Sequence, residues 1–381
     1  MRPYGPEMNR TDQRIPKRRS AVVLAASLLV SGLLMVMLPG SSVATHDDDG
    51  ESSDVTGLKA GALPRLPYVN WPARRIVDGS RRVSISGIQG RVVSLFKVDG
   101  GYLLGRQLTT NPEPGSALTG DHDLVFVSTS GARRSILSGW EAPRRGQLAA
   151  GASVSQNGDK VLVNTRTPVL STGQGAHVDT RVLSLPGGKL LHQRDFGVNG
   201  PALMGYGIDR ALLSLGGDIV WWNPSTDAMT TVLADASAES ADLNAWQVAV
   251  RPLVAGVYHV QGIPAAASPN WTIEQEDVRL GPWSLNGAYL AGNSEVTDGH
   301  DEASSYHVHR TSDGRVIWGL GGGQDPQITW ESNSALLLRT RILHTMRYQL
   351  IRCYLSGSCY RVGPSTSDRR GVIIPATRRN S

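Results

Sequence analysis

The chain has 381 residues, of which 40% are hydrophobic, 19% are charged and only two are cysteines. Its formal net charge is +5, from 38 basic and 33 acidic residues, but six of the basic and two of the acidic ones fall within residues 1–20. The rest of the chain is therefore nearly neutral, which excludes the broad basic surface that a nucleic-acid partner requires.

The first 38 residues have the order of charge and hydropathy that is typical of membrane targeting. A basic head, residues 1–20, is followed by an uncharged apolar run, Ala21–Leu38. Its length is at the lower limit for a membrane-spanning helix and somewhat above the usual core of a signal peptide. A helix of a protein core would show polar residues at helical spacing, and only two serines and one glycine interrupt this run.

Both interpretations of this run, as an anchor or as a signal peptide, place the rest of the chain outside the cytoplasm. Pro39 and Gly40 end the helix, and Ser42-Val43-Ala44 has the small residues that suit signal-peptidase cleavage. We expect either a single-pass protein of the cell membrane with its C-terminal domain outside, or a protein secreted after cleavage near Ala44. The composition of residues 39–65 predicts a linker.

From residue 66 to residue 363 the sequence is typical of an all-β domain. Short runs rich in Val, Leu, Ile and Trp are broken about every eight to twelve residues by Gly, Asn, Asp or Pro, with no long helical periodicity. Hairpin turns recur at Gly131, Gly188, Asp227, Asn270, Gly314 and Gly357. Three of the five separations are 43 or 44 residues, and the turn sequences SQNG (155–158) and SLNG (284–287) lie three such periods apart.

A period in the low forties with four short strands in each unit predicts a β-propeller. A single blade would leave both faces of its sheet bare, so the blades must stack around an axis. We predict seven blades, with six as the alternative, because a further hairpin at Gly79, within Tyr68–Ile85, could complete the last blade. We expect a long loop over 166–179 and a polar tail over 364–381.

The only two cysteines, Cys353 and Cys359, flank the segment Tyr354–Ser358. If a three-residue hairpin loop ends at Gly357 in the left-handed conformation, the two cysteines face each other directly on neighbouring strands, at a separation that a disulfide accepts. Outside the cytoplasm such a pair is expected to be oxidised. The alternatives are a redox pair, which usually has two intervening residues, and half a zinc site, which would need two further ligands nearby.

Four stretches of the chain carry a resemblance to a known group of proteins: DKVLV from Asp159, TRVLSLPGGKLL (180–191), DIVWWNPSTDAMTTV (218–232) and LIRCYLSGSCYRV (350–362). They resemble the WD-repeat-like β-propeller proteins exported by high-GC Gram-positive bacteria, whose last blades often contain an arginine-cysteine pair, a turn and a second cysteine. The chain departs from true WD repeats, because Trp222 is followed by Asn223 and no Gly-His begins a blade. The resemblance implies the propeller architecture, and activity in that group is mostly unassigned.

Few residues suggest catalytic chemistry. The chain has no Gly-x-Ser-x-Gly motif, and the glycine-rich segment Gly319–Pro326 lacks the Lys-Ser/Thr of a phosphate loop, so it is interpreted as a flexible loop between blades. His307 and His309 are two residues apart in a predicted strand, which puts both rings on one face, and with Asp301 they are weak metal candidates. We assign no catalytic residue and no cofactor.

Seven tryptophans lie beside turns or in strands of this domain: Trp221, Trp222, Trp246, Trp271, Trp283, Trp318 and Trp330. We expect most of them to pack blade against blade, although exposed indoles also form platforms for sugars or partner side chains. The function we predict is an extracytoplasmic binding or scaffold propeller with a protein or glycan partner at the cell envelope, contacting the membrane through Ala21–Leu38 if that run is uncleaved. The alternative is an extracytoplasmic lyase or hydrolase, in which acidic, basic and imidazole side chains of several blades meet at the channel mouth.

Overall fold

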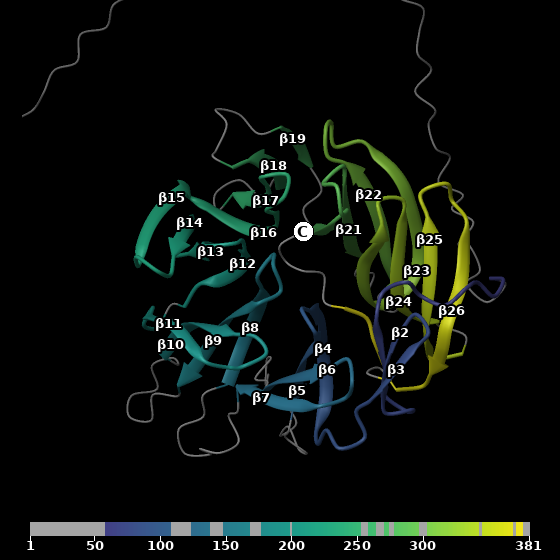
Figure 1. Ribbon diagram of the computed structural model, residues 1–381. Coiled ribbons are helices and arrows are strands. Elements are labelled where there is room, and N and C mark those ends of the chain that lie inside the picture. The colour runs from purple at the N-terminus through teal and green to yellow at the C-terminus, as the bar shows by residue number, and fades with distance from the viewer. Residues whose placement is uncertain are drawn as a thin grey trace, which may run out of the picture. The chain divides into compact units, whose positions relative to one another are not determined.

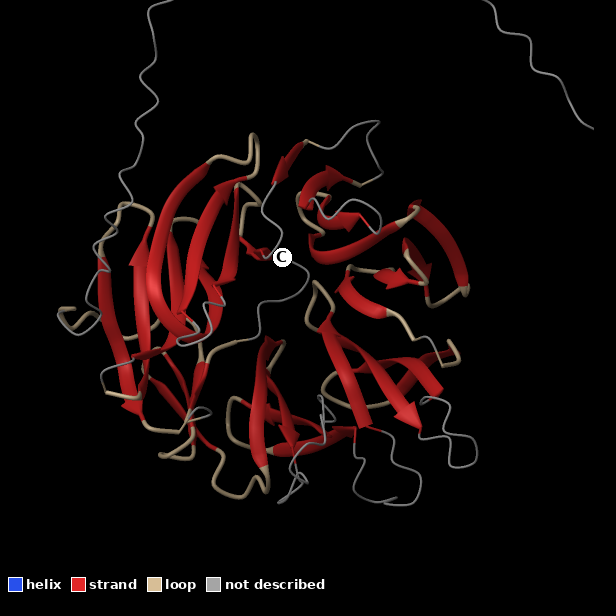
Figure 2. Cartoon of the chain, turned by 180° about the vertical axis from the view of Figure 1, so that it is seen from behind, coloured by secondary structure: helices blue, strands red, loops and turns tan. Residues whose placement is uncertain are grey.

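The structure is a computed structural model of the 381-residue chain. It describes residues 58–107, 123–137, 148–167, 177–198, 200–252, 258–263, 270–273, 278–296, 303–342, 345–368 and 371–375. These residues form strands and turns (Figure 2). Within these ranges there is no helix with the length and hydropathy needed to cross a membrane. The predicted apolar segment Ala21–Leu38 lies outside them.

The strands form antiparallel four-stranded blades around a central axis, so the chain is a seven-bladed β-propeller (Figure 1). The first strand of each blade is nearest the axis and the fourth is outermost (Figure 1). Five blades are separate sheets, and the last two share one seven-stranded sheet. The predicted fold and the predicted number of blades are confirmed.

Blade 1 combines strands from both ends of the described chain, and blades 2 and 3 consist of consecutive strands. Blade 1 consists of β27 (Val372–Ile373), β1 (Tyr68–Asn70), β2 (Arg75–Asp78) and β3 (Arg81–Ser84). Blade 2 consists of β4 (Arg91–Val98), β5 (Gly101–Gln107), β6 (Asp123–Ser128) and β7 (Arg133–Leu137). Blade 3 consists of β8 (Leu148–Val154), β9 (Lys160–Thr167), β10 (His177–Ser184) and β11 (Leu190–Asp195).

Blades 4 to 7 follow in chain order. Blade 4 consists of β12 (Ala202–Tyr206), β13 (Ala211–Leu215), β14 (Asp218–Asn223) and β15 (Ala228–Leu233). Blade 5 consists of β16 (Ala236–Asp242), β17 (Gln247–Pro252), β18 (Tyr258–Gly262) and β19 (Trp271–Ile273). Blades 6 and 7 consist of β20 (Val278–Trp283), β21 (Tyr289–Val296), β22 (Ala303–Arg310), β23 (Val316–Ser332), β24 (Ala335–Ile342), β25 (Arg347–Tyr354) and β26 (Cys359–Thr366).

Strand β23 belongs to two blades. Its residues up to Gly323 pair with β22 as the fourth strand of blade 6, and those from Gln324 pair with β24 as the first strand of blade 7. The prediction of a flexible loop over Gly319–Pro326 is therefore wrong. Glycines weaken a strand but do not prevent backbone pairing, and they suit a place where the strand must bend from the rim of one blade to the axis of the next.

The ring is closed twice. Strand β27 pairs with β1, with Ile373 opposite Val69, and so supplies the first strand of blade 1. The segment before β1 pairs with blade 7 instead: the Gly61 amide donates to the Arg361 carbonyl at 2.8 Å, and the Arg361 amide donates to the Lys59 carbonyl at 2.9 Å. We call this segment, residues 58–65, the strap.

Both closing segments lie in parts of the sequence that predicted no structure. The strap is the end of the predicted linker over 39–65, and β27 lies in the predicted polar tail over 364–381. The hairpin at Gly79 does help to complete the closing blade, as expected, but as its third and fourth strands, with β1 between them and β27. A strand of two residues is too short to show alternation, so the sequence pattern could not reveal it.

The predicted turns occupy equivalent places in the blades. Asn270 immediately precedes the fourth strand of blade 5, and the other predicted turn residues join the third and fourth strands of their blades. These residues, Gly79, Gly131, Gly188, Asp227, Gly314 and Gly357, have positive φ between 57° and 95°. Gly158 and Gly287, which end SQNG and SLNG, join the first and second strands of blades 3 and 6 with φ of 72° and 68°. The predicted repeat is therefore confirmed at both kinds of turn.

Tryptophans connect neighbouring blades across the apolar core. Trp283 is fully buried and donates from its indole Nε1 to the Ser240 hydroxyl of blade 5 at 3.1 Å. Trp330 of blade 7 is 2% exposed and donates to the Pro282 carbonyl of blade 6 at 2.9 Å. Because a buried indole N–H needs a partner, these bonds fix the blades against each other as well as filling space. The expected packing of indoles between blades is confirmed at these positions.

Candidate interaction surface

One end of the ring carries the connections between the first and second strands and between the third and fourth strands of the blades. The strands are antiparallel, so these two kinds of connection must lie at the same end. We call this end the turn face. The opposite end carries the connections between the second and third strands and those that lead from one blade to the next.

An exposed cluster on the turn face combines two indoles and a guanidinium. Trp246, between β16 and β17, is 45% exposed, and its ring centroid lies 5.9 Å from that of Trp221 on β14 in an edge-on arrangement. The guanidinium carbon of Arg210, between β12 and β13, lies 5.2 Å from the Trp221 centroid and 5.5 Å from the Trp246 centroid. The cation is held by both indoles, yet the Arg210 side chain stays 46% exposed. We call Arg210, Trp221 and Trp246 the aromatic–arginine cluster.

The backbone holds Trp246 at the surface. Its φ is 54°, in a left-handed conformation that bulky residues rarely adopt. The Trp246 carbonyl accepts a hydrogen bond from the Ile263 amide at 2.7 Å, which fixes the turn against the end of β18. Trp221 packs on the apolar core between blades 4 and 5 and supports the outer indole. An exposed large side chain in a costly conformation points to an interaction rather than to folding.

The cluster is part of a wider apolar surface. Among the described residues eight large apolar side chains are exposed, and five of them lie on the turn face. These five are Leu190, Ile208, Trp246, Leu285 and Val316, which are 45% to 61% exposed and which we call the apolar tips. Three apolar tips occupy the first-to-second-strand turns of the adjacent blades 4, 5 and 6. Single exposed apolar residues need no explanation, whereas a group on one face indicates an interaction surface.

Polar side chains beneath these tips fix the inner turns. Asp242 is 1% exposed, and its Oδ1 accepts a hydrogen bond from the backbone amide of Asn244 at 2.9 Å. The side-chain amide of Gln156 donates to Asn244 Oδ1 at 2.9 Å, and this bond links blades 3 and 5. Burial raises the pKa of the Asp242 carboxyl. Ser155 and Ser284 cap the corresponding turns of blades 3 and 6 with their hydroxyls. Asp242 is thus a turn-capping residue, and its pKa follows from that buried position.

Exposed basic side chains surround the outer edge of the turn face. They follow the third-to-fourth-strand turns of blades 1, 2, 3 and 6 and are Arg81, Arg82, Arg133, Arg134, Lys189 and Arg315, which we call the basic rim. Within the described part of the chain no member forms a salt bridge. Five acidic side chains of this face, in contrast, are each paired with a Lys or Arg: Asp78, Asp159, Asp209, Asp227 and Asp313. Asp99 is exposed and lacks such a partner, so the unpaired charge of the turn face is mainly positive.

The predicted metal candidates do not form a metal site in the described residues. His307 and His309 share one face of β22, as expected, with ring centroids 6.4 Å apart. His309 is 4% exposed, stacks on Trp271 with centroids 5.8 Å apart, and its Nδ1 lies 3.1 Å from the Gly314 carbonyl oxygen. Burial lowers the pKa of both imidazoles. The described ranges contain no group of three metal-capable side chains, and Asp301 lies outside them.

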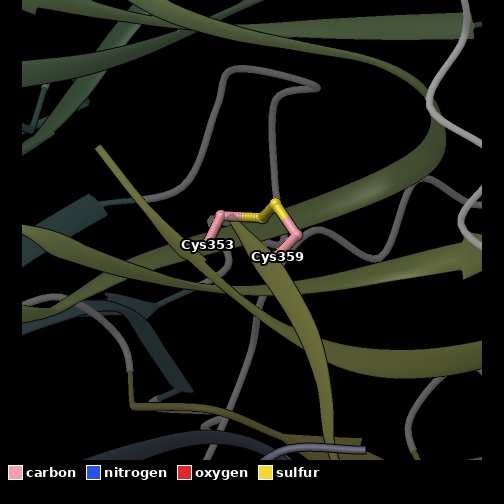
Figure 3. Close-up of a disulfide and its surroundings, with 2 residues drawn as sticks. All are labelled: Cys353 and Cys359. Atoms are coloured by element: carbon pink, nitrogen blue, oxygen red, sulfur yellow. A yellow bond between two sulfur atoms is a disulfide. The ribbon is translucent and has the colours of Figure 1, made fainter. Parts of the chain in front are cut away.

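The two cysteines form a disulfide between β25 and β26 (Figure 3). Their Cα atoms are 4.1 Å apart, and Cys353 is directly opposite Cys359 in the strand register. The Tyr354 amide donates to the Ser358 carbonyl at 2.9 Å around the turn at Gly357. The three-residue hairpin loop and the pairing of the cysteines agree with the sequence-based expectation.

A buried ion pair next to this hairpin holds the strap. Arg352 and Glu331 form a salt bridge in which their side chains are 5% and 1% exposed. Arg352 also donates to the carbonyls of Ala62 at 3.1 Å and Leu63 at 2.9 Å, and Glu331 accepts from the backbone amide of Arg65. The hydrogen bond to Glu331 raises the pKa of the Arg352 guanidinium. The further hydrogen bonds of the pair to Ala62, Leu63 and Arg65 therefore hold the strap.

The strap enters the ring from the turn face. Leu58 packs on the same apolar cluster as Leu355 and Cys359, which lie at the hairpin turn of blade 7. From there the strap runs parallel to β26, with Ala60 beside Arg361. Because β26 itself starts at the turn face, residue 58 lies at that end of the ring.

Sequence reasoning did not find the aromatic–arginine cluster, although a signal was present. The turns SQNG and SLNG were recognised, and the segments GIDR (207–210) and DLNA (242–245) occupy the equivalent turns of blades 4 and 5. They differ from SQNG and SLNG at the serine and glycine positions, so a comparison for identical residues does not detect them. Aligning all inner turns would have placed Ile208, Trp246 and Leu285 on one face.

Comparison with known proteins finds similar solved structures but no matching family. No family model and no curated protein matches the chain. Among solved structures the chain is similar to the uncharacterized protein lmo1340 from Listeria monocytogenes EGD-e, with 10% identity over 82% of this chain and 87% of that chain and a TM-score of 0.47. It is also similar to the β-propeller domain of the Trilobed protease from Pyrococcus furiosus, with 8% identity over 73% and 86% of the two chains and a TM-score of 0.45.

A third similar structure is TolB from Acinetobacter baumannii, with 11% identity over 73% of this chain and a TM-score of 0.42. The matched region spans 65% of that protein. The strand order of the described residues defines the class of the chain, the β-propeller, a fold that in general supports binding and scaffold modules. No particular family follows from similarities of this size.

Proposed function

We propose that the chain is an extracytoplasmic binding or scaffold propeller of the cell envelope. It is held at the outer side of the cytoplasmic membrane by Ala21–Leu38, or released after cleavage near Ala44. Its partner is a protein or glycan of the envelope. The observation that carries this proposal is the gathering of the apolar tips and the basic rim on one face of a closed ring.

The disulfide supports the extracytoplasmic location. Both cysteines of the chain are used in one bond, and such bonds persist in oxidising compartments outside the cytoplasm. The basic head and the apolar run at the start of the sequence favour the same location by the distribution of charge.

The position of the imidazoles favours binding over catalysis. A lyase or hydrolase at the channel mouth would need titratable groups near the axis. His307 and His309 lie on β22, the third strand of blade 6, and His309 is engaged by Trp271 and the Gly314 carbonyl. Asp242 lies on a first strand, but it is buried as a turn cap.

The location can be tested by cysteine labelling in intact cells. Thr345 is exposed between β24 and β25, at the end of the ring away from the turn face, so Thr345→Cys offers one accessible thiol, whereas the wild-type chain offers none if its disulfide is formed. We expect a membrane-impermeant maleimide to label Thr345→Cys in intact cells and to leave the wild type unlabelled. Labelling that requires lysis would overturn the location. The masses of the membrane-bound protein and of the released protein show whether the apolar run is kept as an anchor or removed by cleavage near Ala44.

The binding role can be tested by purifying the full chain from solubilised membranes. We expect one stoichiometric protein or a bound glycan to be recovered with the chain. The control is Met346→Ser, a change at an exposed apolar residue that should recover the same partner. Turnover of a glycan by the purified chain, without stable binding, would instead favour the enzyme.

A further inference from the structure

We propose that the turn face docks on an anionic lipid surface. The inference rests on the proposed location and adds the occupant of this face: the apolar tips enter the interfacial region of the bilayer, and the basic rim pairs with anionic headgroups. A protein or glycan that covers this face in place of lipid is the alternative that the tests below distinguish.

The chemistry of the turn face matches a bilayer surface. Interfacial binding combines apolar side chains that enter the headgroup region with cations that are attracted to anionic lipid. Trp246, Ile208 and Leu285 are 45%, 61% and 54% exposed in the inner turns of neighbouring blades. Tryptophan in particular prefers the membrane–water interface. The members of the basic rim lie outside them and form no salt bridge in the described chain, so their charge is available to a headgroup.

The spread of these groups favours a surface over a compact partner. The apolar tips belong to blades 3 to 6 and the basic rim to blades 1, 2, 3 and 6, so together they involve six of the seven blades. A protein hot spot is concentrated in the centre of its interface. Groups at the ends of turns all around a ring can instead contact one extended plane at the same time.

The described chain begins at the same face. The strap enters the ring at the turn face, where Leu58 packs on the apolar cluster that includes Leu355 and Cys359 of blade 7. Residues 39–57 separate it in sequence from the end of the apolar run at Leu38. If the linker that the sequence predicts here behaves as a random coil, its root-mean-square span is about 25 Å. An uncleaved anchor then keeps the local concentration of lipid high, and a weak contact of the turn face is sufficient to orient the ring.

A first test uses the chain from residue 45, because the ring and both closing segments lie within residues 58–375. We expect it to sediment with vesicles of phosphatidylglycerol and phosphatidylcholine, and not with pure phosphatidylcholine vesicles. The triple variant Ile208→Ser/Trp246→Ser/Leu285→Ser should lower the partition coefficient about tenfold or more. Arg133→Gln/Arg134→Gln should lower it about tenfold or more as well, since each basic side chain near the surface contributes about a fivefold change.

The matched control is Val198→Ser/Met346→Ser. Both residues are exposed, at 51% and 53%, but lie in connections of the opposite end of the ring. We expect this variant to partition like the wild type. Absence of binding to anionic vesicles, or an equal loss in the control, would overturn the proposal.

A second test uses the full chain reconstituted in anionic vesicles that contain brominated lipid. Bromine quenches indole fluorescence at short range, and the difference between the wild type and Trp246→Phe isolates Trp246 from the other eight tryptophans. We expect quenching of Trp246.

An inserted chain without this quenching overturns the docking but not the location. Shielding of Trp246 from a soluble quencher by a purified envelope protein, without lipid, would assign the face to a protein. If the full chain fails to insert while the chain from residue 45 still binds anionic vesicles, anchoring fails and docking stands.

Discussion

The buried pair of Arg352 and Glu331 shows how two side chains can hold a whole segment in place. The pair lies in blade 7, with side chains 5% and 1% exposed, and its spare hydrogen-bonding groups bind the backbone of Ala62, Leu63 and Arg65. Two buried charges are tolerated only when each is paired and its remaining groups are satisfied. The strap supplies those partners, so the ion pair and the strap depend on each other.

Glu331→Gln should strongly destabilise the protein. The change leaves the Arg352 guanidinium buried without a carboxylate, and loss of one partner of such a pair costs about 3–5 kcal/mol. Urea unfolding of the two proteins measures the difference. Asp313→Asn is the control, because the Arg310–Asp313 pair is exposed and its loss should not shift the midpoint. Similar midpoints for Glu331→Gln and Asp313→Asn would show that the buried pair does not stabilise the fold.

Asp242 should make stability depend on pH. Burial raises its folded-state pKa above the ordinary value of an aspartate carboxyl, so the folded protein holds this proton to a higher pH than the unfolded chain. The free energy of unfolding therefore falls as the pH rises from the ordinary pKa through the raised pKa. Asp242→Asn cannot ionise and keeps an oxygen that can accept from the Asn244 amide.

We accordingly expect Asp242→Asn to gain stability relative to the wild type between about pH 4 and about pH 7. Urea unfolding at the two pH values checks this expectation. A difference between variant and wild type that does not change with pH would mean that the carboxyl titrates normally in the folded protein.

At the scale of elements, the hairpin of β25 and β26 has two neighbours that explain its disulfide. The turn carries the bond between Cys353 and Cys359, and the outer strand pairs with the strap through Arg361. A fourth strand at the edge of a blade normally has free backbone groups, and here the strap covers part of them. The disulfide stabilises the hairpin on which the strap is held.

Removal of the disulfide should weaken the protein without unfolding it. The closed loop contains seven residues, for which the chain-entropy model gives about 2 kcal/mol. We expect Cys353→Ala/Cys359→Ala to unfold at lower urea concentration and to retain the β-sheet circular dichroism of the wild type. A thiol assay on the native wild type should find no free thiol, and a chain that cannot fold without the bond would contradict this estimate.

At the scale of the whole molecule, closure makes the two ends of the described chain neighbours. Blade 1 takes three strands from residues 68–84 and its innermost strand from residues 372–373. Val372, Ile373 and Ile374 are 2%, 2% and 3% exposed, although they follow a polar stretch near the end of the sequence. A ring closed by such a strand loses an interface between two blades when the strand is absent.

Truncation after Asp368 should therefore open the ring. Each of the three buried side chains contributes about 1.5–3 kcal/mol on burial, so we expect a loss of about 5 kcal/mol or more. Truncation after Pro375 keeps β27 and should leave the stability unchanged. Thermal unfolding compares the two proteins, and proteolysis should attack blade 1 first in the shorter one. Equal stability would show that β27 is dispensable for closure.

The sequence predicted the features that depend on short-range geometry. Turn residues such as Gly131 and Gly357 adopt positive φ because glycine has no Cβ, and Asp227 does so because aspartate tolerates the left-handed region; their spacing follows the four strands of each blade. The disulfide follows from the same kind of reasoning, since a tight turn fixes which strand residues are opposite each other. The repeat of these local features was sufficient to predict the propeller and its seven blades.

Only the tertiary structure brought together residues that are far apart in the chain. Arg210 and Trp246 meet because the inner turns of blades 4 and 5 are neighbours on one face, and Glu331 reaches the backbone of Arg65 because the ring closes. The short pairing of β27 with β1 has too few residues to leave a periodic pattern. The sequence by itself thus determined the blade and its repetition, because local backbone preferences act within a few residues. The composition of the turn face and the closure were decided by blade packing, because burial acts between segments without regard to their separation in sequence.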